Sequence, residues 1–247
     1  MAVEAGLRRA FLDLCGRVRN RWFPPNFPTD PFDLRYGVDT SGLVEGKSLA
    51  AGHPHDRHGV SYWGTASSLF EGALAHWSEF LAATHCSIGD YTFIDIGSGK
   101  GRVVMLASDH PFHKVIGVEL SPTLVSIARR NLDKWKQSIH PCNDIVLVQS
   151  DVLETPFPDS PVLLYVFNPF DAYITQLLLD RLQALTLTRT APIDIIYTRP
   201  EYPELFNRLP NMQDLWSGDV PFSPEDAAAD VYHGNAQGCS IYRLMAS

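Results

Sequence analysis

The residues whose types and spacing could do chemistry lie between Asp95 and Gly101, in the pattern D-x-G-x-G-x-G. An apolar run at 93–96 is typical of a buried parallel strand, and the apolar residues of 103–107 are typical of a helix. Glycine at a strand-to-helix turn adopts conformations closed to other residues and lets a ligand approach closely, because it has no Cβ. The segment therefore predicts a ligand site with a carboxylate beside it.

The spacing of the glycines limits which ligand this is. A dinucleotide-binding turn reads G-x-G-x-x-G. Here Gly101 comes one residue early, and Asp95 precedes Gly97 by two positions. The pattern disfavours a nicotinamide cofactor. Taken alone, it leaves another nucleotide site and a purely structural loop open.

Two further strands are predicted to end in an acid. The run 114–119 ends in Glu119, and the run 145–151 ends in Asp151. Glu119 lies about twenty residues after the glycine turn, where an acid can accept both ribose hydroxyls, and Leu120 would then lie beside the adenine. Three successive strand-end acids next to a glycine turn favour a cofactor site over a structural loop.

The predicted fourth strand, 162–167, runs directly into Asn168-Pro-Phe170. In an open parallel sheet, ligands bind at the carboxyl ends of the strands where strand order reverses, and the first and fourth strands flank that point. A fifth strand is expected at 193–197, and two more within 211–218 and 239–244, with a loop at 223–230. We therefore expect an α/β fold with a doubly wound, mostly parallel, seven-stranded sheet.

These ordered motifs resemble class I S-adenosylmethionine-dependent methyltransferases over about residues 60–247. The runs Phe-Ile-Asp-Ile-Gly-Ser-Gly-Lys-Gly-Arg and Gly-Val-Glu-Leu-Ser-Pro look closest to uncharacterised bacterial members. They are also similar to protein lysine methyltransferases of the same fold. The resemblance implies S-adenosylmethionine as methyl donor and S-adenosylhomocysteine as product. It divides the chain into an N-terminal helix and irregular wrap, 1–60, and a methyltransferase domain, 61–247.

The resemblance also implies roles for individual residues. Asp95 would hold the ammonium end of the cofactor, and the backbone of Gly97, Ser98, Gly99 and Gly101 would pass beneath its amino acid part. Asp151 would accept a hydrogen bond from the adenine amino group, with the Val152 amide as the other polar contact. Tyr62 and Thr65, with Ser67, are candidate lid contacts. Asn168, Pro169 and Phe170 resemble the N-P-P-[YF] motif of amino-group methyltransferases without its second proline, which favours an amine acceptor.

Composition excludes several classes of protein. The charge of -8 argues against a broadly basic nucleic-acid-binding surface, and no apolar run reaches the roughly 18 residues of a membrane span. The four cysteines form no C-x-x-C pair, so we expect reduced thiols in a cytoplasmic protein and no zinc site. The loop His53-Pro-His-Asp-Arg-His58 matches no familiar ligand spacing. We expect a solvated loop there and no metal.

The N-terminal part has one clear pattern. An apolar stripe with accompanying arginines predicts a basic amphipathic helix over 7–22. A helix packed on the main domain is the simplest interpretation; a presequence, a membrane-surface helix and a partner-binding arm stay open. Prolines between 24 and 31 then predict an irregular wrap to about residue 60. Ser68 and Glu71 are spaced as a capping box, and 69–81 carries a buried helical stripe.

The sequence therefore predicts a methyltransferase that acts on an amine such as a protein lysine. Three alternatives stay open: a small-molecule or nucleic-acid acceptor, a nicotinamide-dependent oxidoreductase, and a cofactor-binding scaffold without catalysis. The acceptor, the oligomeric state and a general base are not predicted, because fold and cofactor site say little about substrate.

Overall fold

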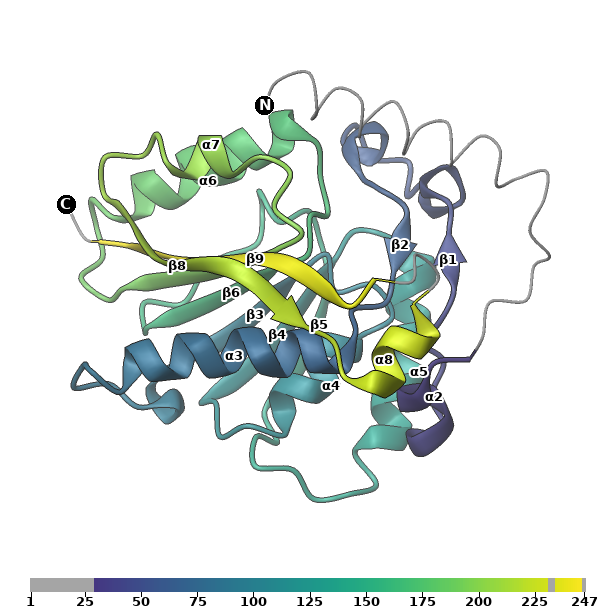
Figure 1. Cartoon of the computed structure of the whole chain (residues 1–247). Coiled ribbons are helices and arrows are strands. Elements are labelled where there is room, and N and C mark those ends of the chain that lie inside the picture. Colours follow the sequence, from purple (N-terminus) through teal and green to yellow (C-terminus); the bar gives the residue numbers. More distant parts are fainter. Residues whose placement is uncertain (1–28, 231–233, 246–247) are drawn as a thin grey trace.

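The computed structural model describes residues 29–230 and 234–245, and the helix predicted over 7–22 lies outside them. Seven strands form one sheet in the order β5-β4-β3-β6-β7-β9-β8 (Figure 1). Their bounds are β3 Thr92–Ile96, β4 Lys114–Glu119, β5 Ile145–Gln149, β6 Val162–Val166, β7 Ile193–Thr198, β8 Met212–Pro221 and β9 Ala236–Leu244. The first five are parallel, and β9 is antiparallel to both β7 and β8. The predicted seven-stranded, mostly parallel sheet is confirmed.

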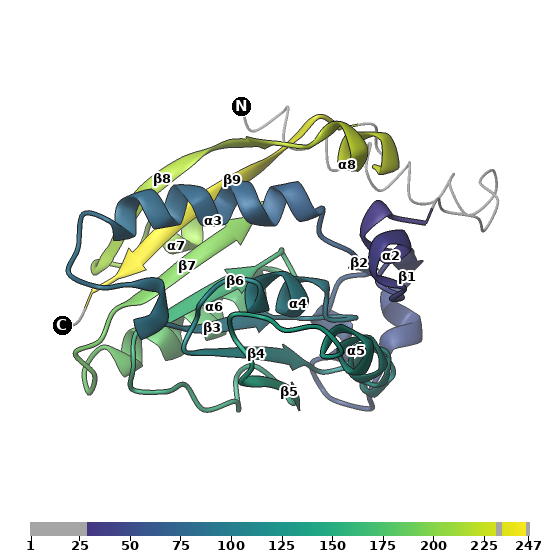
Figure 2. The ribbon, with the colours of Figure 1, turned by 90° about the horizontal axis from the view of Figure 1, so that it is seen from below.

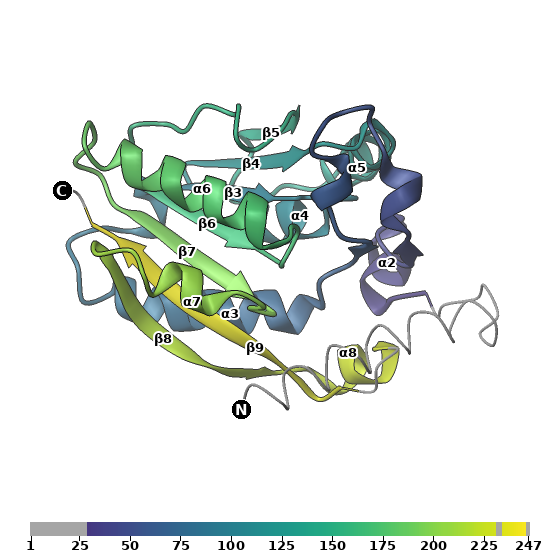
Figure 3. The same ribbon diagram turned by 90° about the horizontal axis from the view of Figure 1, so that it is seen from above.

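Helices cover both faces of this sheet. Figure 2 shows α3 (Ser67–Leu81), α4 (Arg102–Ser108) and α5 (Pro122–Trp135) on one face, and Figure 3 shows α6 (Ala172–Leu185) and α7 (Pro203–Phe206) on the other. Alternate strand residues supply the two cores: Phe93 packs with the first group of helices, while Ile94 and Ile96 pack with the second. Burial on both faces explains why these strands are continuous apolar runs.

Strand order reverses between β3 and β6, which are direct neighbours. Ile96 is paired with Val118 of β4 on one side and with Val166 of β6 on the other. The carboxyl ends of β4, β3 and β6 therefore meet at one edge. The turns that follow them bring Glu119, the glycine turn and Asn168 to the point where open α/β sheets bind ligands.

The segment 29–66, called the strap below, crosses beyond this edge (Figure 1). It contains α2 (Pro31–Tyr36), a small antiparallel sheet of β1 (Leu43–Val44) and β2 (Tyr62–Trp63), and 3-10 turns at Gly46–Leu49 and Asp56–His58. A third 3-10 turn lies at Ile88–Asp90. The strap is thus more regular than the predicted wrap, because Asp30 caps α2 and Gly37 ends it in the left-handed region.

Two local predictions were wrong. Ser68 and Glu71 form no capping box: Ala66 is the N-cap of α3, the Ser68 amide donates to Asp226, and Glu71 pairs with His110 instead. The acidic, alanine-rich stretch expected as a loop contains a helix, α8 (Pro224–Ala229), which Ser223 caps. In both places a short-range pattern was replaced by a contact between α3 and α8, which are about 155 residues apart in sequence.

Within the described residues, no helix combines the length and hydropathy that a membrane span requires. The described cysteines that lack a disulfide are Cys86, Cys142 and Cys239, and the last two are buried. Burial raises the pKa of the Cys239 thiol to about 12, so this side chain packs as a neutral group.

Candidate functional site

A cavity of about 480 Å³ lies between the strap and the carboxyl edge of the sheet. Twelve of the residues predicted as cofactor-binding or catalytic line it: Tyr62, Thr65, Asp95, Gly97, Ser98, Glu119, Leu120, Asp151, Val152, Asn168, Pro169 and Phe170. Gly99 and Gly101 belong to the same turn but are not among the lining residues. Residues from five segments far apart in sequence thus meet around one space.

The glycine turn has the backbone geometry that its glycines allow. Gly97, Gly99 and Gly101 have φ values of 74°, 54° and 86°, in the left-handed region. A Cβ on Gly97 would lie 2.7 Å from the Pro169 ring, and one on Gly99 would lie 2.2 Å from the Tyr62 ring. The turn therefore needs glycine for conformation and for space. Part of that space is taken by this protein's own lid and acceptor residues.

Asp95 is the candidate for a cationic ligand group. Its side chain is only 4% exposed, it lines the cavity, and no hydrogen-bond partner for it is found within the described part of the chain. Burial and then the nearby Glu119 carboxylate raise its pKa well above the usual range. A buried acid without a partner at a cavity wall fits an ammonium group, which would restore the charged form.

Glu119 points back toward the glycine turn. One carboxylate oxygen accepts the Gly99 amide at 2.9 Å, and the other accepts the Ser121 amide at 2.8 Å. Burial raises the pKa of Glu119, and these amide hydrogen bonds oppose that rise. Each carboxylate oxygen can accept more than one hydrogen bond. The acid thus joins the turn to β4 and can still accept ribose hydroxyls.

Asp151, the acid expected to bind adenine, has a side-chain partner that the sequence did not predict. Oδ1 accepts the Leu153 amide at 2.8 Å, while Oδ2 lies 2.5 Å from Nδ1 of His55. The histidine loop, expected in solvent, therefore packs on the acid predicted to bind adenine. The reason is local: Asp56 accepts the Ala51 and His53 amides and folds the loop back over the cavity.

Asn168 is held by a residue that the sequence analysis did not single out, Tyr197 on β7. The buried phenol accepts the Glu201 and Tyr202 amides at 3.1 and 3.3 Å. Its own proton is therefore free to donate to Oδ1 of Asn168, at 3.1 Å. Asn168 has a φ of 42°, so its backbone is also in the left-handed region. The signal in the sequence was a tyrosine near the carboxyl end of the strand next to β6.

The strap pairs with the residues that follow Asn168. The Val60 amide donates to the Pro169 carbonyl at 3.2 Å, and the Asp171 amide donates to the His58 carbonyl at 3.0 Å. Asp171 caps α6 and also binds His58 at 2.7 Å. Burial alone would raise the pKa of Asp171, but hydrogen bonds from His58 and from α6 outweigh it and lower that pKa. This acid is structurally occupied, which leaves it a poor general base.

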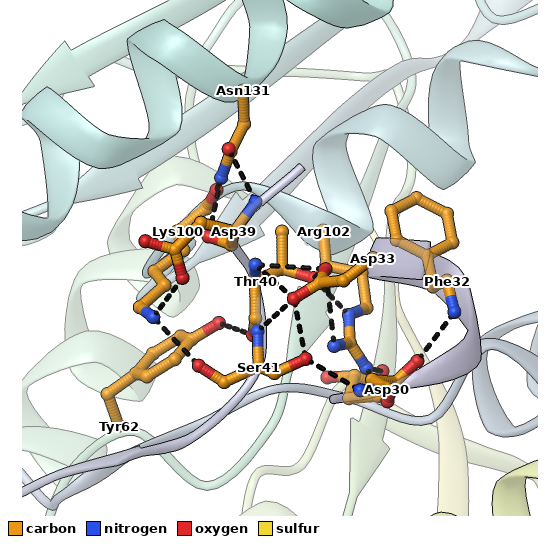
Figure 4. Close-up of polar contacts among 11 residues, drawn as sticks. Asp30, Phe32, Asp33, Asp39, Thr40, Ser41, Tyr62, Lys100, Arg102 and Asn131 are labelled. Carbon is orange, nitrogen blue, oxygen red and sulfur yellow. Dashed lines mark hydrogen bonds and ion pairs between the residues drawn. The ribbon is translucent and has the colours of Figure 1, made fainter. Parts of the chain in front are cut away.

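A polar network ties the strap to the helix after the glycine turn (Figure 4). Arg102, 3% exposed, donates to Thr40 Oγ1, Asp30 Oδ2 and the Thr65 carbonyl. Lys100, inside the turn, donates to Asp39 Oδ1 and the Ser41 carbonyl, both at 2.7 Å. The Tyr62 hydroxyl donates to the Thr40 carbonyl at 2.6 Å, and burial raises its pKa above the usual range. The sequence analysis gave Lys100 and Arg102 no role.

Known proteins resemble the central part of this chain. Residues 93–184 match a family model described as a methyltransferase domain. A comparison with curated proteins found no match.

Solved structures with a similar fold include three methyltransferases. An RNA methyltransferase from Salinibacter ruber in complex with S-adenosyl-L-homocysteine is 21% identical, with 68% of this chain and 88% of that chain covered and a TM-score of 0.41. A tRNA m1G37 methyltransferase from M. jannaschii is 13% identical, with coverage of 75% and 52% and a TM-score of 0.49. Magnesium protoporphyrin IX methyltransferase from Synechocystis PCC 6803 is 10% identical, with coverage of 71% and 79% and a TM-score of 0.48.

The strand order, the glycine turn with its three strand-end acids, and the matching family model define the class. The chain has the class I methyltransferase fold, and the methyltransferase-domain model that matches residues 93–184 makes it an S-adenosylmethionine-dependent methyltransferase. The residues present fit this cofactor, since an unpartnered buried acid and a close-approach glycine turn face a cavity large enough for a nucleoside-sized ligand.

Proposed function

We propose that this methyltransferase acts on an amine, such as the side chain of a protein lysine. The observation that carries the proposal is the position of Asn168-Pro-Phe170 at the end of β6. There the Pro169 ring packs against Gly97 of the cofactor turn. An acceptor bound beside these residues would lie next to the methyl donor.

Asn168 would orient the acceptor nitrogen. Because the Tyr197 hydroxyl donates to Oδ1, the amide is fixed with its oxygen toward Tyr197 and its NH2 group on the other side. Oδ1 has a second acceptor position, which can take one N–H of a neutral amine. The Pro169 carbonyl already accepts the Val60 amide, so its remaining lone pair is the second candidate contact.

The cavity walls would keep the amine neutral. The aromatic side chains of Tyr62, Phe167 and Phe170 line it. Desolvation by such walls lowers the pKa of an amine, and an unprotonated nitrogen is required for attack. When bound, S-adenosylmethionine supplies a methyl group on a sulfonium, a good leaving group. The chain's contribution is then to align the acceptor and to exclude water.

For the cofactor we propose the following contacts. Asp95 holds the ammonium group, Glu119 the ribose hydroxyls, and Asp151 with the Val152 amide the adenine edge. Leu120 lies beside the adenine, Thr65 closes the methionine end, and the backbone of Gly97, Ser98 and Gly99 passes beneath the amino acid part. Gly101, at the start of α4 and against Ala128, acts by letting the helix pack closely. Residues 61–247 would form the methyltransferase domain, in the cytoplasm, with the rest of the strap closing it.

A nucleic-acid or small-molecule acceptor is the main alternative. Two of the similar structures are RNA and tRNA methyltransferases, and one acts on a porphyrin. The charge of -8 supports the protein or small-molecule amine over a nucleic acid. An inactive scaffold would bind the cofactor without transferring methyl groups.

A labelling experiment separates these possibilities. Cell lysate is incubated with radiolabelled S-adenosylmethionine and either the wild-type protein or Asn168→Ala, and then fractionated into protein, nucleic acid and small molecules. We expect label in protein or in small amines, reduced by about 100-fold or more in the variant, in line with the loss of a group that orients the reacting atoms. Label in nucleic acid, or labelling that Asn168→Ala leaves unchanged, would overturn the proposed acceptor.

A further inference from the structure

Three metal-ligating side chains gather at the adenine end of the cavity. Nδ1 of His53 and Nδ1 of His55 face the same atom, Oδ2 of Asp151, at 3.6 and 2.5 Å. The three ligand atoms all lie within 4.8 Å of one another. The two imidazole side chains are 28% and 29% exposed, and the carboxylate is 5% exposed. The cluster is thus half-enclosed and reachable from solvent.

The hydrogen bonds in this cluster do not explain why both imidazoles face the same carboxylate oxygen. His55 makes one imidazole hydrogen bond to Oδ2, which leaves that oxygen a further acceptor position. His53 Nδ1 also faces Oδ2, but 3.6 Å is too long for a hydrogen bond. In the part of the chain that the structure describes, the hydrogen bond to this nitrogen comes from the His55 backbone amide, at 3.2 Å. His58 is not a member, because its Nδ1 binds Asp171 at 2.7 Å.

The separations suit a small divalent transition metal. Bonds of roughly 2.0–2.2 Å in tetrahedral geometry place neighbouring ligand atoms about 3.3 Å apart. The His53–Asp151 pair is already close to that value. The His55–Asp151 pair would open by roughly 0.8 Å, and the weak contact between the His55 amide and His53 would be lost. Two histidines and one carboxylate, with a fourth position for water, form a ligand set that zinc accepts.

We propose that His53, His55 and Asp151 bind a divalent transition metal of the zinc class, and that this metal competes with the cofactor for Asp151. The metal takes the place of the proton between His55 and Asp151; that proton leaves Nδ1 for solvent, His55 stays a neutral imidazole with its N–H at Nε2, and no electron is transferred. The histidine loop is then fixed over the adenine end of the cavity. The competition rests on the proposed contact of Asp151 with adenine: both ligands then need this carboxylate, so each weakens the other by the same factor.

Zinc binding is the first arm of the test. Zinc chloride is titrated into the full-length, tag-free protein by calorimetry, and into His53→Ala, His55→Ala and the control His113→Ala, whose exposed side chain lies at the far end of β4. We expect one micromolar site in the wild type and in the control, weakened at least tenfold in each of the other two. Absence of binding by the wild type at about millimolar zinc, or unchanged affinity in both loop variants, would overturn the metal site.

The second arm measures S-adenosylhomocysteine binding with and without saturating zinc. We expect at least a tenfold loss of affinity with zinc in the wild type, and no zinc effect in His55→Ala. Equal affinities in the wild type with and without zinc would overturn the competition. Titration of S-adenosylhomocysteine without zinc tests the cofactor site alone, so failure of the metal proposal and failure of the cofactor assignment are distinguishable.

Discussion

The carboxyl edge of the sheet and the strap build the two walls of one cavity by different means. At the edge, parallel strand pairing sets the positions of Asp95 and Glu119, whose side chains follow from their places at strand ends. The strap has one two-stranded ladder of two residue pairs, and it is held by charged and polar side chains, chiefly Arg102 and Lys100. A regular backbone ladder presents the cofactor wall, whereas a buried polar network presents the lid.

This difference has a consequence for substitutions. Ladder hydrogen bonds involve only the backbone, so a side-chain change at the edge alters ligand binding more than the fold. The strap depends on a few buried side chains, and loss of one leaves partners unsatisfied. Substitutions at the sheet edge should therefore change ligand affinity, whereas substitutions in the strap should change the free energy of unfolding.

The largest stability effect is expected for Arg102→Met. The guanidinium is 3% exposed and binds Asp30, Thr40 and the Thr65 carbonyl, so its removal leaves buried acceptors without a donor. We expect a loss of roughly 3–5 kcal/mol in the free energy of unfolding, measured by chemical denaturation. Arg129→Met, an exposed arginine on α5, is the control. Equal losses in the two variants would contradict the role of the network.

Asp95→Asn tests the opposite wall. The side-chain shape is kept while the charge that faces the cofactor ammonium is removed. We expect the Kd for S-adenosylmethionine to rise about 100-fold, as for loss of one partner of a buried charge pair. Asp144→Asn, at an exposed position before β5, should bind as the wild type does. A variant that binds with wild-type affinity would remove Asp95 from the site.

The raised pKa of Asp95 predicts how this binding depends on pH. In the free protein, burial and Glu119 favour the protonated acid, while the bound ammonium favours the ionised form, so binding releases a proton. Affinity should therefore rise with pH, by at most about tenfold per unit, between the pKa of Asp95 in the complex and its raised pKa in the free protein, and level off above the latter. Calorimetry in two buffers of different ionisation enthalpy measures the released proton, and Asp95→Asn should lack that contribution.

Tyr197→Phe should affect turnover without affecting cofactor binding. It removes the hydrogen bond that fixes the Asn168 amide, worth about 1–1.5 kcal/mol, which corresponds to about tenfold in kcat. Transfer of labelled methyl groups to the acceptor fraction measures the loss, and S-adenosylhomocysteine affinity should stay constant. Tyr173→Phe, a half-exposed tyrosine of α6, is the control. A parallel loss of cofactor affinity would indicate general damage to the site.

The smallest effect concerns the start of α3. Asp226→Ala removes the acceptor of the Ser68 amide and should cost about 1 kcal/mol of stability, as loss of a helix cap does. Glu71→Ala should stay within about 0.5 kcal/mol, because its pair with His110 is near the surface. Thermal unfolding compares the two variants. A larger loss of stability for Glu71→Ala than for Asp226→Ala would contradict the role of Asp226 and favour the capping box.

The sequence predicted what short-range rules determine. The carboxyl ends of the strands, with Asp95, Glu119 and Asp151 at or just after them, follow from hydrophobic runs and turn residues. The sequence did not predict the hydrogen bond from Tyr197 to Asn168. Nor did it predict the contact between His55 and Asp151, which are about 100 residues apart in sequence. Such contacts depend on which side chains the tertiary fold brings together, and no local pattern encodes them.

Calorimetric titration of S-adenosylmethionine tests the central claim most directly, with wild-type protein, Glu119→Ala, Asp151→Ala and the control Asp144→Ala. We expect one site in the wild type and control, with affinity at least tenfold weaker in Glu119→Ala and in Asp151→Ala, each of which loses charge-assisted hydrogen bonds. Absence of binding by the wild type, or unchanged affinity in both of these variants, would contradict the assignment of the cavity as the methyl-donor site.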